Sequence, residues 1–144
     1  MKKDSNLESV LRGDGMSAVD WDTLKKYENV TNISLKELRD ELGLGSWAVR
    51  TSFNTNYQGV VIQQQPGEGN RKHHHPEADE NWVIMDGEFE WWIDGKGTMK
   101  VKTGDIINVK KGTRHQITCI SDEPAVRYAV NWPDVMHVYE GDDE

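Results

Sequence analysis

The strongest constraint on the fold is a series of short extended segments separated by turn residues, which begins at Trp47 and runs almost to the end of the chain. Nine segments have the composition of strands: 47–53, 58–65, 72–76, 80–86, 88–94, 97–102, 105–109, 114–120 and 126–132. The breaks between them carry turn-forming residues, as in Asp86-Gly87 and Asp94-Gly95. Strands this short and this closely spaced predict an antiparallel barrel or sandwich and not a parallel α/β sheet.

The first third of the chain has a polar, helical pattern instead. Two short helices are predicted before residue 30, and a third follows the capping box Ser34-Leu-Lys-Glu37 and ends at Gly43. This third helix is similar to half of a helix-turn-helix, but a strand pattern follows where the recognition helix should stand. We therefore expect three regions: a helical N-terminal arm at 1–45, a barrel at 46–134 and an acidic C-terminal tail at 135–144.

Composition and charge narrow the possible partners. The chain has 144 residues, which is near the commonest domain size, and a formal net charge of −8. A negative balance disfavours nucleic acid and anionic membrane as partners. No apolar segment approaches the length of a membrane span, so we expect a cytoplasmic protein that binds a small molecule. Cys119 is the single cysteine, which excludes an intrachain disulfide.

A histidine cluster provides the strongest functional signal. His73 and His75 are alternate residues of one predicted strand, so both side chains point to the same face while His74 points to the other. Glu80 follows in the next strand, and His115 comes from a more distant one. Three imidazoles and one carboxylate would form a ligand set suited to Fe, Mn, Ni, Cu or Zn. A surface cluster of histidines without a ligand is the alternative.

At these positions the sequence resembles the cupin superfamily. Its first signature matches at Gly67, His73, His75, Glu80 and Gly87, and its second at Gly104, Gly112 and His115. Lys110 and Cys119 depart from the second signature, and neither position supplies a ligand. The resemblance covers roughly residues 45–133, and it implies an all-β double-stranded β-helix, the jelly-roll barrel, with one metal ion held by the three histidines and the glutamate. This fold supports many unrelated chemistries, so the resemblance does not define the reaction.

Strand alternation extends the ligand face into a predicted substrate pocket. Its members are Gln63, Gln65, Trp82, Ile84, Ile117, Cys119, Arg50 and Arg127. One alternate set of the three consecutive glutamines must face inward, and the alternative is that Gln64 alone does so. An arginine is included because guanidinium binds carboxylates in a bidentate manner.

The strand 88–94 contains two adjacent tryptophans, so one of them must point away from the core. We predict that Phe89, Trp91 and Ile93 face inward and that Trp92 faces outward. An outward tryptophan among acidic neighbours is more often covered than exposed, so we expect Trp92 to lie at a helix or subunit contact of a homodimer.

Three function classes remain after these exclusions. The first is an Fe(II)-type dioxygenase or other oxidoreductase acting on a small organic acid, diketone or phenol. The second is a redox-neutral isomerase or lyase in which the metal ion polarises a carbonyl group. The third is a non-catalytic protein that binds a metal ion or small ligand. Iron is the preferred metal, because a tetrahedral zinc ion with four protein ligands would retain no open position.

Overall fold

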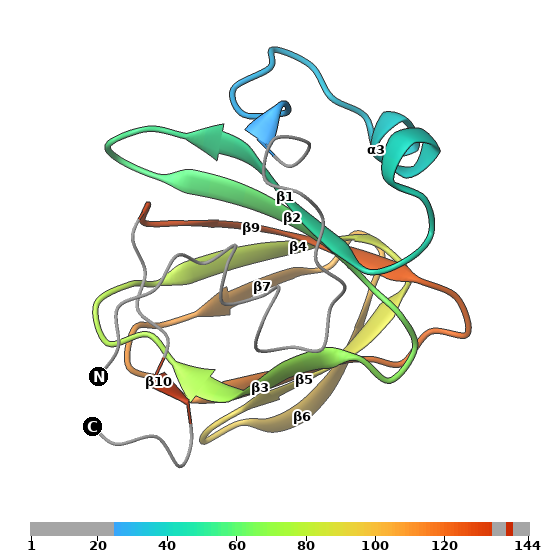
Figure 1. Ribbon diagram of the computed structural model, residues 1–144. Coiled ribbons are helices and arrows are strands. Elements are labelled where there is room, and N and C mark those ends of the chain that lie inside the picture. Colours follow the sequence, from blue (N-terminus) through green and yellow to red (C-terminus); the bar gives the residue numbers. More distant parts are fainter. Residues whose placement is uncertain (1–24, 134–137, 140–144) are drawn as a thin grey trace.

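The computed structural model describes residues 25–133 and 138–139 (Figure 1). One helix and ten strands lie within this part of the chain: α3 (Leu35–Leu42), β1 (Trp47–Phe53), β2 (Gln58–Gln64), β3 (Gly69–His74), β4 (Glu80–Asp86), β5 (Glu88–Ile93), β6 (Gly97–Lys102), β7 (Ile106–Val109), β8 (His115–Cys119), β9 (Ala125–Asn131) and β10 (Val138–Tyr139).

The strands form two five-stranded sheets that face each other (Figure 1). The first sheet has the order β1-β2-β9-β4-β7 and the second the order β10-β3-β8-β5-β6. Every pairing is antiparallel. The predicted all-β jelly roll is therefore confirmed, and all nine predicted strands are present. The short β10, which pairs with β3, was not predicted.

The space between the sheets is filled by large side chains at alternate strand positions. In β5, Phe89, Trp91 and Ile93 are buried as predicted, while Trp92 is only half-buried on the opposite face. The indole rings of Trp82 and Trp91 meet edge to face at the centre of the barrel, with their centroids 5.4 Å apart. Such aromatic pairs, together with the area they bury, supply much of the packing energy of a small barrel.

The helix α3 lies on the outer side of the first sheet, next to β1 and β2 (Figure 1). Its capping box forms as predicted, because the Ser34 side chain accepts a hydrogen bond from the backbone N–H of Glu37. The side chain of Arg39 holds the helix against the barrel through hydrogen bonds. Its guanidinium donates to Gln63 Oε1 and to Asp86 Oδ2, each at 2.8 Å.

The two helices predicted before residue 30 fall almost entirely outside the described residues, as does most of the acidic tail. Within the described part of the chain, no helix is long and apolar enough to cross a membrane.

Candidate metal centre

The structure brings the four predicted ligands together at one end of the barrel. His73 lies near the end of β3 and His75 directly follows that strand, Glu80 begins β4 and His115 begins β8. His73 and His115 are direct partners across the β3–β8 ladder. One donor atom of each of the four residues lies within 4.8 Å of the others, and all four side chains are buried. His74 points to the opposite face of β3 and is not part of this group.

Backbone carbonyl groups fix the orientation of two of the imidazoles. His73 Nδ1 lies 2.6 Å from the carbonyl oxygen of Arg71, and His115 Nδ1 lies 3.0 Å from that of Thr113. A carbonyl oxygen only accepts, so each Nδ1 must carry the proton and donate it. The Nε2 lone pair of each ring is then directed into the cluster. This is the tautomer that a metal-binding histidine adopts.

The Glu80 carboxylate has two different environments at its two oxygens. Oε1 lies 3.0 Å from His75 Nε2 and 3.1 Å from His115 Nε2. Oε2 accepts a hydrogen bond of 3.0 Å from Asn131 Nδ2, and Asn131 Oδ1 in turn accepts one of 3.1 Å from Gln58 Nε2. Asn131 and Gln58 are both buried. They hold the carboxylate so that one oxygen faces the histidines.

The electrostatics of the cluster favour an ionised carboxylate. Burial alone would raise the pKa of Glu80, but the adjacent imidazoles of His75 and His115 hold this pKa well below its usual value. Glu80 is therefore negatively charged at neutral pH, as a metal ligand must be.

The ligand atoms of the cluster are better placed to bind a common metal ion than to form hydrogen bonds with one another. Neither Glu80 Oε1 nor His115 Nε2 forms a well-directed hydrogen bond with the described residues, although the two atoms face each other. Both are lone-pair donors aimed at a common point. Adjacent ligand atoms on an octahedral ion with bonds near 2.1 Å are about 3.0 Å apart. The two contacts of Glu80 Oε1, at 3.0 Å to His75 Nε2 and 3.1 Å to His115 Nε2, have this separation, so the cluster has the chemistry and the dimensions to hold one divalent ion.

Four of the predicted pocket residues lie on the same inner face as the ligands. Trp82 and Ile84 follow Glu80 at alternate positions of β4, and Ile117 and Cys119 follow His115 in β8. All four are buried. Burial raises the pKa of the Cys119 thiol, so this side chain is a neutral packing residue and not a nucleophile.

The glutamines are arranged differently from the prediction. Gln63 Nε2 donates to the carbonyl oxygens of Gly43 and Gly45, and Gln65 Nε2 donates to that of Leu44. Both amides bind the segment that joins α3 to β1 and lie outside the barrel. The assignment of Gln63 and Gln65 to the pocket is thus corrected. Gln64 faces the interior instead, where its buried side-chain Oε1 accepts a hydrogen bond of 3.0 Å from Arg127 Nε. This is the arrangement that the sequence offered as the alternative.

The two predicted arginines occupy different environments. Arg50 pairs with Glu28 through its Nη2 at 2.5 Å and stacks on Phe53. Arg127 is fully buried inside the barrel, four residues before Asn131 on β9.

Around Arg127 the structure forms an internal polar group. Its Nε donates to Gln64 Oε1 at 3.0 Å, its Nη2 donates to Asn70 Oδ1, and its guanidinium lies 4.5 Å from the centroid of the Trp82 ring. Sequence reasoning missed Asn70, Gln58 and Asn131. Asn131 could have been found, because it shares the inward alternation of Arg127.

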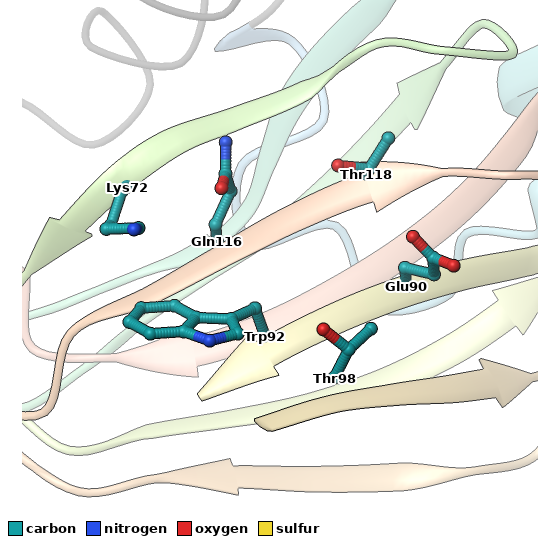
Figure 2. A pocket seen from close by; sticks show the side chains of 6 residues that line it. All are labelled: Lys72, Glu90, Trp92, Thr98, Gln116 and Thr118. Atoms are coloured by element: carbon teal, nitrogen blue, oxygen red, sulfur yellow. The ribbon is translucent and has the colours of Figure 1, made fainter. Parts of the chain in front are cut away.

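Trp92 lies on the outer face of the second sheet, as predicted (Figure 2). Its ring borders a shallow hollow of about 200 Å³, and the Lys72 ammonium lies 4.4 Å from the ring centroid. The other lining side chains are polar: Glu90, Thr98, Gln116 and Thr118. This hollow is separated from the metal cluster by the sheet itself.

Fold and site together define a jelly-roll protein with a buried centre of three histidines and one glutamate. The sequence pattern of the cupin domain matches residues 60–131. The chain belongs to the cupin family, which confirms the resemblance seen in the sequence.

Solved structures with the same fold have low sequence identity to this chain. A double-stranded β-helix protein from Klebsiella pneumoniae is 20% identical with a TM-score of 0.58, and the match covers 85% of this chain and 95% of that one. A sugar phosphate isomerase of the cupin superfamily from Silicibacter pomeroyi is 24% identical with a TM-score of 0.54, covering 61% and 59%. An oxalate decarboxylase from Lactobacillus farciminis is 21% identical with a TM-score of 0.55, covering 60% and 27%. At these identities the likeness concerns the fold. Curated proteins give no significant match.

Proposed function

We propose that the chain is a metal-dependent enzyme that acts on a small organic molecule, with His73, His75, Glu80 and His115 as the ligands of one divalent transition metal. The observation that carries this proposal is the convergence of four buried donor atoms within 4.8 Å. Two of the imidazoles are already held by backbone carbonyls in the ligating tautomer. Such preorganisation has no role in a surface cluster of histidines, which was the alternative.

Iron in the Fe(II) state is our first choice, and Mn, Ni and Cu suit the same ligands. A divalent ion with six positions would offer two of them to a substrate and would polarise the bound oxygen atoms. Asn131 keeps Glu80 Oε2 occupied, so the carboxylate presents one oxygen to the cluster and leaves room for a substrate that binds through two atoms.

The interior favours an oxygen-rich substrate. The indole N–H groups of Trp82 and Trp91 are buried, and neither has a hydrogen-bond partner among the described residues. The same is true of Gln64 Nε2. Buried donors without acceptors are costly, and substrate oxygens or water would satisfy them. We therefore expect a hydroxy acid, a keto acid or a sugar derivative in preference to an apolar phenol.

Two reaction classes fit such a substrate. An Fe(II)-type dioxygenase requires O2 as a second substrate, and the buried walls of Trp82, Ile84 and Ile117 would exclude bulk water from the reaction. A redox-neutral isomerase or lyase needs no oxidant. The second class is supported by the fold relatives described as a sugar phosphate isomerase and an oxalate decarboxylase.

The test begins with protein purified without oxygen and analysed for bound metal. The iron, manganese and nickel forms would then be supplied with panels of hydroxy acids, keto acids and sugar phosphates. Consumption of O2 in step with substrate loss supports the dioxygenase, whereas equal turnover under nitrogen supports the isomerase or lyase. Stoichiometric metal without turnover of any panel would contradict an enzymatic role and favour a metal-binding or ligand-binding protein.

A further inference from the structure

The short strand β10 adds a side chain to the row that holds two of the ligands. It pairs with the end of β3, where Tyr139 is the ladder partner of His73 (Figure 1). His73 is in turn the partner of His115 on β8. Direct partners in a ladder point to the same face of the sheet, so the Tyr139 side chain lies on the inner face beside these ligands. It is 7% exposed, and its ring centroid lies 5.6 Å from that of His73. Tyr139 therefore forms part of the wall of the histidine cluster.

The guanidinium of Arg71 lies over the ring of Tyr139, with its Cζ atom 3.9 Å from the ring centroid. The ladder between β3 and β8 is irregular from Asn70 to His73, so Arg71 leaves the regular alternation of the strand. Its backbone carbonyl oxygen accepts the hydrogen bond from His73 Nδ1. Arg71 thus orients a ligand through its main chain and places a cation beside the cluster through its side chain.

Arg71 differs from the other arginines in what its side chain contacts. Arg39, Arg50 and Arg114 each form an ion pair with an aspartate or a glutamate. Within the part of the chain that the structure describes, Arg71 has no such carboxylate partner. It is also exposed, whereas Arg127 is fully buried. A guanidinium that is held by the face of an aromatic ring keeps its N–H groups available for an anion from solution.

The charge of the whole chain gives such a cation a role in binding. A net charge of −8 repels anionic molecules, and a hydroxy acid or keto acid is an anion at neutral pH. A metal ion at the cluster attracts the end of the molecule that it binds, but an anionic group at the other end needs a cation of its own. Guanidinium is suited to this task, because it binds carboxylate and phosphate groups in a bidentate manner.

We infer that Arg71, held against Tyr139, binds a second anionic group of the substrate, a carboxylate or a phosphate. The inference rests on the proposed metal centre, which binds the other end of the same molecule. Because the contacts run from His73 to Tyr139 and from Tyr139 to Arg71, the guanidinium meets a group several bonds away from the chelating end. The substrate class is therefore a hydroxy acid or keto acid with an anionic group at its far end, and Arg71 determines this specificity.

The test uses the full-length protein loaded with Co²⁺, whose absorption spectrum changes when a chelating acid replaces water at the metal ion. The probes are α-hydroxyglutarate and α-hydroxyvalerate, which have the same chelating end and the same chain length and differ in the terminal carboxylate. Wild type is expected to bind α-hydroxyglutarate more tightly. Arg71→Leu should weaken the binding of α-hydroxyglutarate by about 10-fold or more and leave that of α-hydroxyvalerate unchanged.

Two sets of variants separate a binding role of Arg71 from a general effect of charge or of folding. Arg114→Leu removes the same charge beside His115, and it should leave the ratio of the two affinities unchanged. Arg71→Lys keeps the charge without the bidentate geometry and should retain part of the preference. Tyr139→Phe keeps the ring that holds the guanidinium and should retain the preference, whereas Tyr139→Leu should reduce it. The Co²⁺ content of each variant establishes that the metal centre is intact.

The outcomes distinguish this inference from the proposed function. A wild-type protein that binds no Co²⁺ would contradict the metal centre and, with it, the inference. If Co²⁺ is bound, three results would overturn the role of Arg71 alone: equal affinity of wild type for the two acids, an unchanged preference in Arg71→Leu, or an equal loss of preference in Arg114→Leu. A third probe, 3-phosphoglycerate, distinguishes the two anions. Tighter binding of it than of α-hydroxyglutarate by wild type assigns the Arg71 site to a phosphate, and weaker binding assigns it to a carboxylate.

Discussion

The hydrogen bond from Asn131 to Glu80 should control how tightly the centre binds metal. Asn131 Nδ2 donates to the buried carboxylate at 3.0 Å, and Gln58 donates to Asn131 at 3.1 Å. Hydrogen bonds to charged groups contribute about 1.5–3 kcal/mol, and loss of a group that orients a metal ligand costs about 10- to 100-fold in metal affinity. The two estimates agree, because a tenfold change corresponds to about 1.4 kcal/mol. We predict a loss in this range for Asn131→Ala.

The assay is a competition titration of Mn²⁺ or Zn²⁺ against a fluorescent chelator. Asn81→Ala is the matched control, because Asn81 follows Glu80 directly but points out of the barrel and is exposed. It should leave the affinity unchanged. Asn131→Asp replaces the donor with a second carboxylate and should weaken binding at least as much as Asn131→Ala. An affinity for Asn131→Ala within about twofold of wild type would refute this account of Glu80, since it would mean that the 3.0 Å contact does not orient the ligand.

Further predictions concern the helix α3 and Tyr27. Arg39→Leu removes the contacts to Gln63 and Asp86 and should lower the free energy of unfolding in urea by about 1–3 kcal/mol, with metal content unchanged. Burial and the neighbouring Glu41 raise the pKa of Tyr27 to about 12, so its contribution to stability is complete below pH 10 and is lost as pH rises towards 12. An alkaline absorbance titration should show a late-titrating phenol that Tyr27→Phe removes; persistence of that late component in the variant would contradict the assignment.

The sequence predicted most of the fold because its period-two pattern and its turns were unambiguous. The predicted strands 47–53, 80–86 and 97–102 have the observed bounds. The two-residue β10 was missed because Val138-Tyr139 is too short to show any alternation. The inward orientation of Trp91 and the outward orientation of Trp92 followed from alternation with Phe89 and Ile93.

The histidine cluster could be anticipated from the sequence, whereas its surroundings could not. Alternation placed His73, His75, Glu80 and His115 on inner faces, and the register of β3 with β8 then brought them together. The prediction of which glutamines face inward was wrong for Gln63 and Gln65, because three identical residues in a row show no alternation of polar and apolar positions.

Hydrogen-bond partners that are distant in the sequence determine which glutamine side chains face inward. The backbone carbonyl groups of Gly43 and Gly45 accept hydrogen bonds from the side-chain amide of Gln63 outside the barrel, while Arg127 donates one to Gln64 in the interior. Hydrogen bonds between residues far apart in the sequence cannot be predicted from the local pattern of polar and apolar residues. For the same reason, the sequence did not identify Gln58 and Asn70 as members of the interior polar groups.

The central claim is that the four-residue cluster is a metal site, and a comparison of two neighbouring histidines tests it most directly. Protein purified anaerobically would be measured for bound metal by mass spectrometry in wild type, His75→Ala and His74→Ala. His75 lies in the cluster, whereas His74 is the next residue of the chain and points to the opposite face of β3. We predict about one metal ion per chain in wild type and in His74→Ala, and loss of most of it in His75→Ala. Equal metal content in the two variants, or equal loss in both, would contradict the proposed centre.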